Sequence, residues 1–144
     1  MGLMLSEWAH EMVQHDFRTY SRDPPPQLLN KRFFRNHVEI AGLHANRSSA
    51  IRYIAGAVEA DLRGVVHGLE LDREPANPHD PNAIRVSGWW GLAKEFLGYV
   101  PAAYAPPYAK VADNGGDILA VPKRVYRGHD DFVEIRFVIY GVYP

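Results

Sequence analysis

Residues 69–86 have the sequence LELDREPANPHDPNAIRV, in which two strand patterns flank a polar loop. The first strand ends at Arg73-Glu74-Pro75, and the second begins at Asn82 or Ala83. Asn and Asp side chains bond to nearby backbone, and each of the loop's three prolines fixes a φ angle. We therefore predict two strands joined by a stiff, polar loop.

Apolar side chains at every second residue, the pattern of a half-buried strand, recur on both sides of this stretch. This pattern predicts six short strands, over residues 33–45, 65–71, 83–86, 97–100, 118–125 and 133–140. A helix is expected over residues 50–62, after Ser48 and Ser49 as caps, and a second helical stretch over 101–113. Six short strands with few helices indicate a mainly β, α+β domain, rolled into a compact barrel.

The N-terminal residues differ from the rest of the chain. Apolar side chains at helical spacing predict an amphipathic helix over residues 6–20, and Pro24-Pro25-Pro26 then forms a stiff, extended spacer. We expect two parts, a helix and spacer over 1–32 and a barrel domain over 33–144. The helix either closes the barrel or serves for docking, for example in a homodimer that buries Trp8 and Trp89-Trp90.

Composition limits the classes of partner. The 144 residues are 47% hydrophobic and 23% charged, which is typical of a globular protein. Sixteen Lys and Arg against seventeen Asp and Glu give a net charge of −1, which argues against a protein that coats long nucleic acids. Local basic clusters still occur, at Lys31, Arg32 and Arg35 and at Lys123, Arg124 and Arg127.

Several classes of chemistry lack their motifs. The chain has no Cys, no phosphate-binding or dinucleotide-binding glycine motif, and no GxSxG or HExxH, and its seven His form no close pair. We therefore expect no enzyme activity, no cofactor and no metal. The start lacks a secretory signal and no apolar run could span a bilayer, so a cytoplasmic protein without membrane contact is predicted.

The polar side chains of the loop allow two interpretations. Asn77, His79, Asp80 and Asn82 either only satisfy one another in a rigid turn, or present preorganised donors and acceptors to a hydroxyl or a base. A third hypothesis is a metal-dependent nuclease that uses Asp72, Glu74, His79 and Asp80, which would require these carboxylates to converge.

The run REPANPHDPNAIRV resembles the central motif of the HIRAN domain, a family found in fork-remodelling helicase-like proteins and as separate bacterial proteins. The resemblance extends upstream to Gly42-Leu43-His44 and downstream to Leu97-Gly98-Tyr99-Val100-Pro101, and covers about residues 34–142. It implies a small OB- or SH3-like barrel that captures the free 3′ end of single-stranded DNA in repair or replication.

The resemblance also implies roles for individual residues. Asp80 would accept a hydrogen bond from the terminal 3′-hydroxyl, His79 would contact a base, and Asn77 would support the loop. A carboxylate accepts strongly from a hydroxyl but repels a phosphate, so Asp80 would favour a terminus over an internal nucleotide.

In the DNA-binding member of the family, an Arg and adjacent aromatic residues follow Gly-Leu. This chain departs from that pattern, because it has His44-Ala45-Asn46 at the same place. Arg47 or Arg52 could replace the charge, and Phe132 and Tyr99 could supply rings. The nucleic-acid-binding residues expected are Asp80, His79, Asn77, His44, Tyr99, Phe132 and Arg47.

The expected partners are single-stranded DNA 3′ ends and a helicase or nuclease that acts on them. The alternative is a protein-interaction or inhibitor protein that reuses the barrel without DNA, which the near-neutral charge, Ala45 and the apolar N-terminal helix favour.

Overall fold

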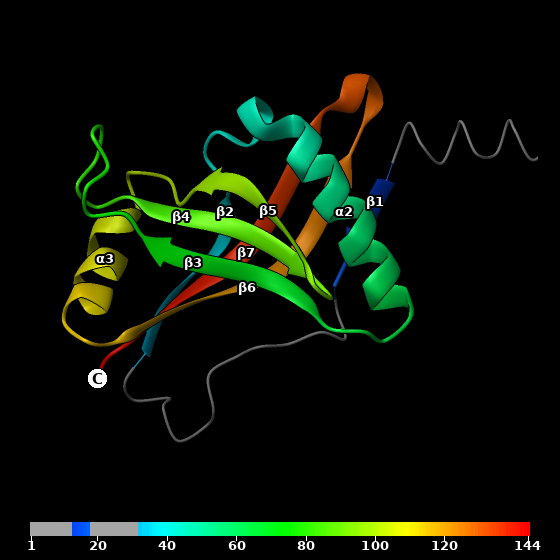
Figure 1. Cartoon of the computed structure of the whole chain (residues 1–144). Coiled ribbons are helices and arrows are strands. Elements are labelled where there is room, and N and C mark those ends of the chain that lie inside the picture. The colour runs from blue at the N-terminus through cyan, green and yellow to red at the C-terminus, as the bar shows by residue number, and fades with distance from the viewer. Residues whose placement is uncertain (1–12, 18–31) are drawn as a thin grey trace, which may run out of the picture.

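A computed structural model describes residues 13–17 and 32–144, which form an α+β fold built on one antiparallel sheet (Figure 1). Its strands are β1 (Val13–Asp16), β2 (Arg32–Glu39), β3 (His67–Arg73), β4 (Ile84–Trp90), β5 (Ala93–Tyr99), β6 (Asp117–Arg127) and β7 (Val133–Val142). The helices are α2 (Arg47–Leu62) and α3 (Ala105–Asp113), with short 3-10 helices η2 (Leu43–Asn46) and η3 (His129–Asp131). The α+β prediction is confirmed, with seven strands in place of six.

The strands follow the order β2-β7-β6-β3-β4-β5, and β1 pairs with β6 beside this path. β6 and β7 pair along almost their whole length, from Asp117↔Val142 to Arg127↔Val133. β3 pairs with β4 over seven residue pairs, and β4 with β5 across a bulge at Val86/Ser87. The hairpins β3–β4 and β6–β7 thus have the longest strand pairings in the described sheet.

The sheet is rolled, and closure into the barrel that the strand count predicts is not detected in the described residues. Its two ends meet at a single bridge in the described residues, where Ala41 and Tyr99 exchange N–H···O bonds of 2.8 and 3.0 Å. The predicted strand over 33–45 ends at Glu39 instead, and the chain turns at Gly42, whose φ of 78° suits glycine. Too little extended chain follows β2 to build a ladder with β5.

Helix α2 covers one face of the sheet (Figure 1), and its buried Tyr53, Ile54 and Ala57 enter the main core. The helix approaches β4 closely, because a Cβ at Gly88 would collide with the ring of Tyr53. Trp90 packs against the same helix at Gly56. Trp89 and Trp90 are thus the last two residues of β4.

Residues Val13–Asp16 correct the prediction of a helix over 6–20, because they pair with β6 as a strand. Phe17, which follows, is 1% exposed, and His15 Nε2 lies 2.7 Å from Asp61 Oδ2 on α2. The alternation Val13, His15, Phe17 fits the sheet, so strand pairing prevailed over helical spacing. The rest of that predicted helix, the triproline spacer and Trp8 lie outside the described residues.

Helix α3 begins at Ala105, so Pro106 and Pro107 occupy its first turn. Prolines are tolerated there because the first N–H groups of a helix have no partner within it. Among the described helices, none is long and apolar enough to cross a membrane.

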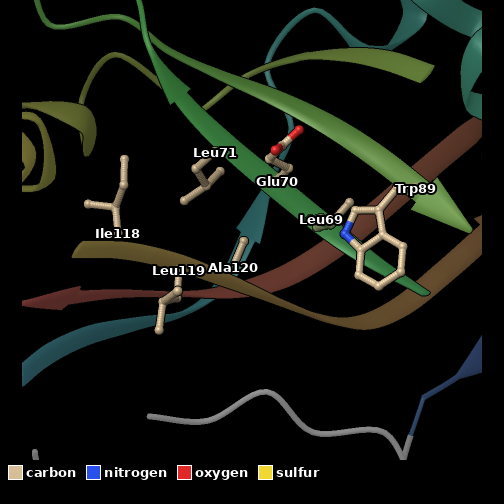
Figure 2. A pocket seen from close by; sticks show the side chains of 7 residues that line it. All are labelled: Leu69, Glu70, Leu71, Trp89, Ile118, Leu119 and Ala120. Atoms are coloured by element: carbon tan, nitrogen blue, oxygen red, sulfur yellow. The ribbon is translucent and has the colours of Figure 1, made fainter. Parts of the chain in front are cut away.

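Strands β3 and β6 touch at the register pair Leu69↔Ala120 and diverge on either side. The resulting hollow has a volume of about 200 Å³, and Figure 2 shows Leu71 and Ile118 projecting between the two strands, with Trp89 at the other end. Its charged lining residue, Glu70, pairs with Lys94. The other side chains that line the hollow are aliphatic or aromatic.

Candidate nucleic-acid interface

The β3–β4 loop, residues 74–83, is organised around Asn77. The Asn77 Oδ1 atom accepts hydrogen bonds from the backbone N–H of His79, at 2.9 Å, and of Asp80, at 3.1 Å. The Asn77 amide nitrogen donates to Glu74 Oε1 at 3.1 Å. These bonds hold the peptide groups before and after His79 in place.

Asp80 uses one carboxylate oxygen for the fold and leaves the other open. Its Oδ1 accepts from the backbone N–H of Asn82 at 2.8 Å, and its carbonyl accepts from Ala83 N at 3.1 Å. No side-chain or backbone donor in the described parts of the chain bonds to Oδ2. The half-buried carboxylate is therefore fixed in direction, and its Oδ2 atom can still accept a hydrogen bond. The neighbouring His79 ring is exposed.

Arg73 anchors the loop to the rest of the molecule. Its guanidinium donates to the carbonyls of Ala83, at 2.7 Å, and Pro81, at 3.0 Å, and forms a two-pronged ion pair with Asp113 on α3 at 2.9 and 3.0 Å. The planar fork of Arg suits such multiple acceptors. Sequence reasoning missed this residue, although a charge at the last position of β3 was its visible signal.

Glu74 connects the loop to β5. Its Oε1 accepts from the Tyr99 hydroxyl at 2.9 Å as well as from Asn77. The hydrogen bonds from Asn77 and Tyr99 hold the pKa of Glu74 below its usual value, and the bond to Glu74 raises the pKa of Tyr99. Tyr99 thus joins Asn77 and Asp80 in one hydrogen-bonded group. Glu74, which the sequence offered only as a metal ligand of a nuclease, connects Tyr99 to Asn77 in this group.

The remaining predicted residues form a second group. The rings of His44 and Phe132 lie 4.9 Å apart, and Tyr126 touches Phe132 edge-on at 6.0 Å. Arg47 begins α2 beside them, and residues 44–49 line an open pocket of about 390 Å³. His44 and Arg47 are exposed, and Phe132 is 46% exposed.

The two groups meet at the bridge between the ends of the sheet. Tyr99 belongs to the first group through Glu74 and bonds through its backbone to Ala41, three residues before His44. Asn46 reinforces the contact, since its amide donates to the carbonyl of Leu97 at 3.5 Å. The interface therefore has a hydrogen-bonded loop on one side of Tyr99 and a ring-lined, exposed segment on the other.

The nuclease hypothesis required Asp72, Glu74, His79 and Asp80 to converge. Glu74 instead bonds to Tyr99 and Asn77, and Asp80 Oδ1 bonds to the backbone of Asn82. Within residues 13–17 and 32–144, no three His, Asp or Glu side chains gather as metal ligands would. These carboxylates organise the loop.

The chain is similar to one known protein family and to one solved structure. The family model of the HIRAN domain matches residues 45–143, a range that includes the loop, Tyr99 and Phe132. No curated protein matches the chain. A crystal structure of a protein from Lactobacillus plantarum is similar over 76% of this chain and 96% of that chain, with 20% sequence identity and a TM-score of 0.48.

Proposed function

The chain belongs to the HIRAN domain family, a module generally linked to DNA binding, and we propose that it captures the free 3′ end of single-stranded DNA without catalysis. In this role the protein holds a DNA terminus during repair or replication. A helicase or nuclease partner would perform any chemical step on the captured strand.

The hydrogen bonding of the Asp80 carboxylate is the main support for this proposal. Its Oδ1 is held by Asn82 N, so the carboxylate cannot swing freely, while Oδ2 has no partner among the described residues. A terminal 3′-hydroxyl is a donor and matches this acceptor. A phosphate has only acceptors at neutral pH and meets a negative charge, so an internal nucleotide or a 3′-phosphate is disfavoured.

The backbone of the loop supports the same selectivity. The N–H groups of His79 and Asp80, which could have bound a phosphate, both donate to Asn77 Oδ1. The loop therefore presents an acceptor and an exposed imidazole rather than a nest of donors. His79 would stack on the terminal base, because an imidazole can lie against a base face.

The second group would contact the nucleotides next to the terminus. The His44 and Phe132 rings offer an exposed aromatic surface, and Arg47 offers a positive charge. Stacking of this kind accepts any base, so the group adds affinity without sequence preference.

The test is fluorescence anisotropy with short single strands that differ only in a 3′-hydroxyl or a 3′-phosphate, at several salt concentrations. We expect the hydroxyl strand to bind about tenfold more tightly, which corresponds to about 1.4 kcal/mol. Asp80→Asn keeps the Oδ1 acceptor for Asn82 but replaces the free acceptor with a donor, so it should abolish the preference.

Asp117→Asn is the matched control, because Asp117 is exposed at the start of β6. It removes the same charge and should leave the preference intact. Equal affinity of the wild-type protein for both strands would refute end capture. Absence of binding to either strand at low salt would instead favour the protein-interaction alternative.

A further inference from the structure

Some of the Lys and Arg side chains in the described residues have no carboxylate partner. Of the Lys and Arg side chains in the described residues, eight pair with Asp or Glu: Arg52, Arg63, Arg73, Arg85, Lys94, Arg124, Arg127 and Arg136. No described carboxylate pairs with the other five, Arg32, Arg35, Arg47, Lys110 and Lys123. Unpaired cations are the ones most available to a phosphate.

Two of these five cations, Arg35 on β2 and Lys110 on α3, lie on the side of the sheet that α3 covers. Arg35 is exposed, and its guanidinium carbon lies 4.0 Å from the centre of the Tyr104 ring. Lys110 is exposed on α3, whereas Arg32 lies over Tyr140 on the other face of the sheet. Stacking on a ring orients a guanidinium while its N–H edges stay available for hydrogen bonds. Arg35 is therefore a positioned cation without a carboxylate to neutralise it.

An aromatic groove adjoins these cations, and we call it the α3 groove. It has a volume of about 300 Å³ and is lined by Phe33, Pro107, Lys110, Asn114 and Tyr143, among others. Phe33 stacks on Tyr108 at 4.7 Å and touches Tyr143 at 5.5 Å. Tyr143 is 53% exposed, so one side of its ring is open to a ligand.

Helix α3, which lines the groove, ends beside the β3–β4 loop. Arg73 links the β3–β4 loop to Asp113, the last residue of α3, and Figure 1 shows α3 beside that loop. From the other side, Tyr104 follows Tyr99 by five residues, and its N–H bonds to the carbonyl of Pro101 at 2.9 Å. The groove therefore lies next to the loop that holds Asp80.

We propose that the α3 groove binds the nucleotides upstream of the captured 3′ end, with phosphates on Arg35 and Lys110 and a base on Tyr143. The inference rests on the proposed function and extends it to the length of strand bound. Pro101, Ala102 and Ala103, between Tyr99 and Tyr104, supply no cation. Arg35 on β2, whose guanidinium stacks on the Tyr104 ring, supplies a cation there instead.

The test compares strands of three and ten thymidines, both with a 3′-hydroxyl. The wild-type protein should bind the longer strand about tenfold more tightly, because only this strand reaches the α3 groove. Arg35→Gln and Lys110→Gln should each remove most of that gain and leave the short strand unaffected. Each should also reduce the slope of log affinity against log salt for the longer strand by about 0.7, the value for one phosphate of a single strand.

Arg63→Gln is the matched control, because Arg63 is exposed on α2 but paired with Glu59 at 3.0 Å. It removes one charge and should not alter the gain from length. Lys110→Gln changes an exposed helix position, so it tests the groove even if Arg35→Gln lowers stability.

The two proposals fail in different ways. Preference for the 3′-hydroxyl that Asp80→Asn abolishes, with equal affinity for short and long strands, would overturn the α3 groove and keep end capture. A loss of length dependence in Arg63→Gln as large as in Arg35→Gln would also overturn it, since the effect would then be one of net charge. A gain from length without any hydroxyl preference would support the groove and refute end capture.

Discussion

The β3–β4 loop and the segment His44–Arg47 flank the same tyrosine, yet they are built differently. In the loop, the Asn77 side chain bonds to the Glu74 carboxylate and to the His79 N–H, and Arg73 donates to the carbonyl of Ala83. In the segment, only the Asn46 amide makes a side-chain hydrogen bond among the described residues, and His44 contacts Phe132 through their rings. The loop has a shape before a ligand arrives, whereas the segment offers adaptable surface.

This difference assigns different tasks to the two regions. A preorganised group loses little conformational entropy on binding and can discriminate between a hydroxyl and a phosphate. An exposed ring contributes stacking energy that depends weakly on which base or terminus is bound. Substitutions in the loop should therefore change stability and selectivity, and those in the segment should change affinity alone.

The largest effect is expected at Arg73, whose side chain is 13% exposed. Arg73→Ala removes the bonds to Ala83, Pro81 and Asp113, and should lower the free energy of unfolding by about 2–3 kcal/mol in urea denaturation. Arg63→Ala breaks an exposed ion pair on α2 and should cost at most about 0.5 kcal/mol. Equal losses in the two variants would mean that the loop is not anchored by Arg73.

A smaller loss of stability, with a loss of selectivity, is expected at Asn77. Asn77→Ala leaves the N–H groups of His79 and Asp80 without their acceptor, which should cost about 1–2 kcal/mol and remove the hydroxyl preference. Asn77→Asp keeps that acceptor but loses the bond to Glu74 and places two carboxylates together. The stability of Asn77→Asp, measured by thermal unfolding, and its preference for the 3′-hydroxyl strand, measured by anisotropy, should lie between those of Asn77→Ala and the wild-type protein. Full selectivity in Asn77→Ala would contradict the role of the loop in positioning Asp80.

The smallest effect on the fold is expected at Phe132, which is 46% exposed. Phe132→Ala should change the free energy of unfolding by less than about 1 kcal/mol, while removing a stacking surface worth about 1–3 kcal/mol per base. Binding of hydroxyl and phosphate strands should weaken by the same factor, measured by anisotropy. A change in their ratio would show that selectivity extends beyond the loop.

The strands and the loop that carry the proposed site could be predicted because their signals are local. The alternation that predicts strands over 65–71 and 133–140 lies within β3 and β7 or close to them, and the prolines and Asn77 mark the loop between strands. Ser48 and Ser49 led us to start the first helix near residue 50, three residues late. Local patterns of this kind need no knowledge of the tertiary structure.

The missed features depend on contacts between distant residues. Val13–Asp16 is a strand because β6 offers an edge to pair with, and a helical spacing in the sequence does not reveal that edge. In the described residues the ends of the rolled sheet share a single bridge because the chain turns at Gly42, whose positive φ the alternation cannot show. Likewise, Arg73 acquires its role only when α3 places Asp113 beside it, forty residues later in the chain.

The most direct measurement of the central claim is an NMR titration of ¹⁵N-labelled protein with two strands that differ only in a 3′-hydroxyl or a 3′-phosphate. We predict that the amide signals of His79, Asp80 and Asn82 shift strongly with the hydroxyl strand and weakly with the phosphate strand, and that Asp80→Asn removes this difference. Equal shifts with both strands, or shifts that leave these three amides unchanged, would contradict the capture of a 3′ end by Asp80.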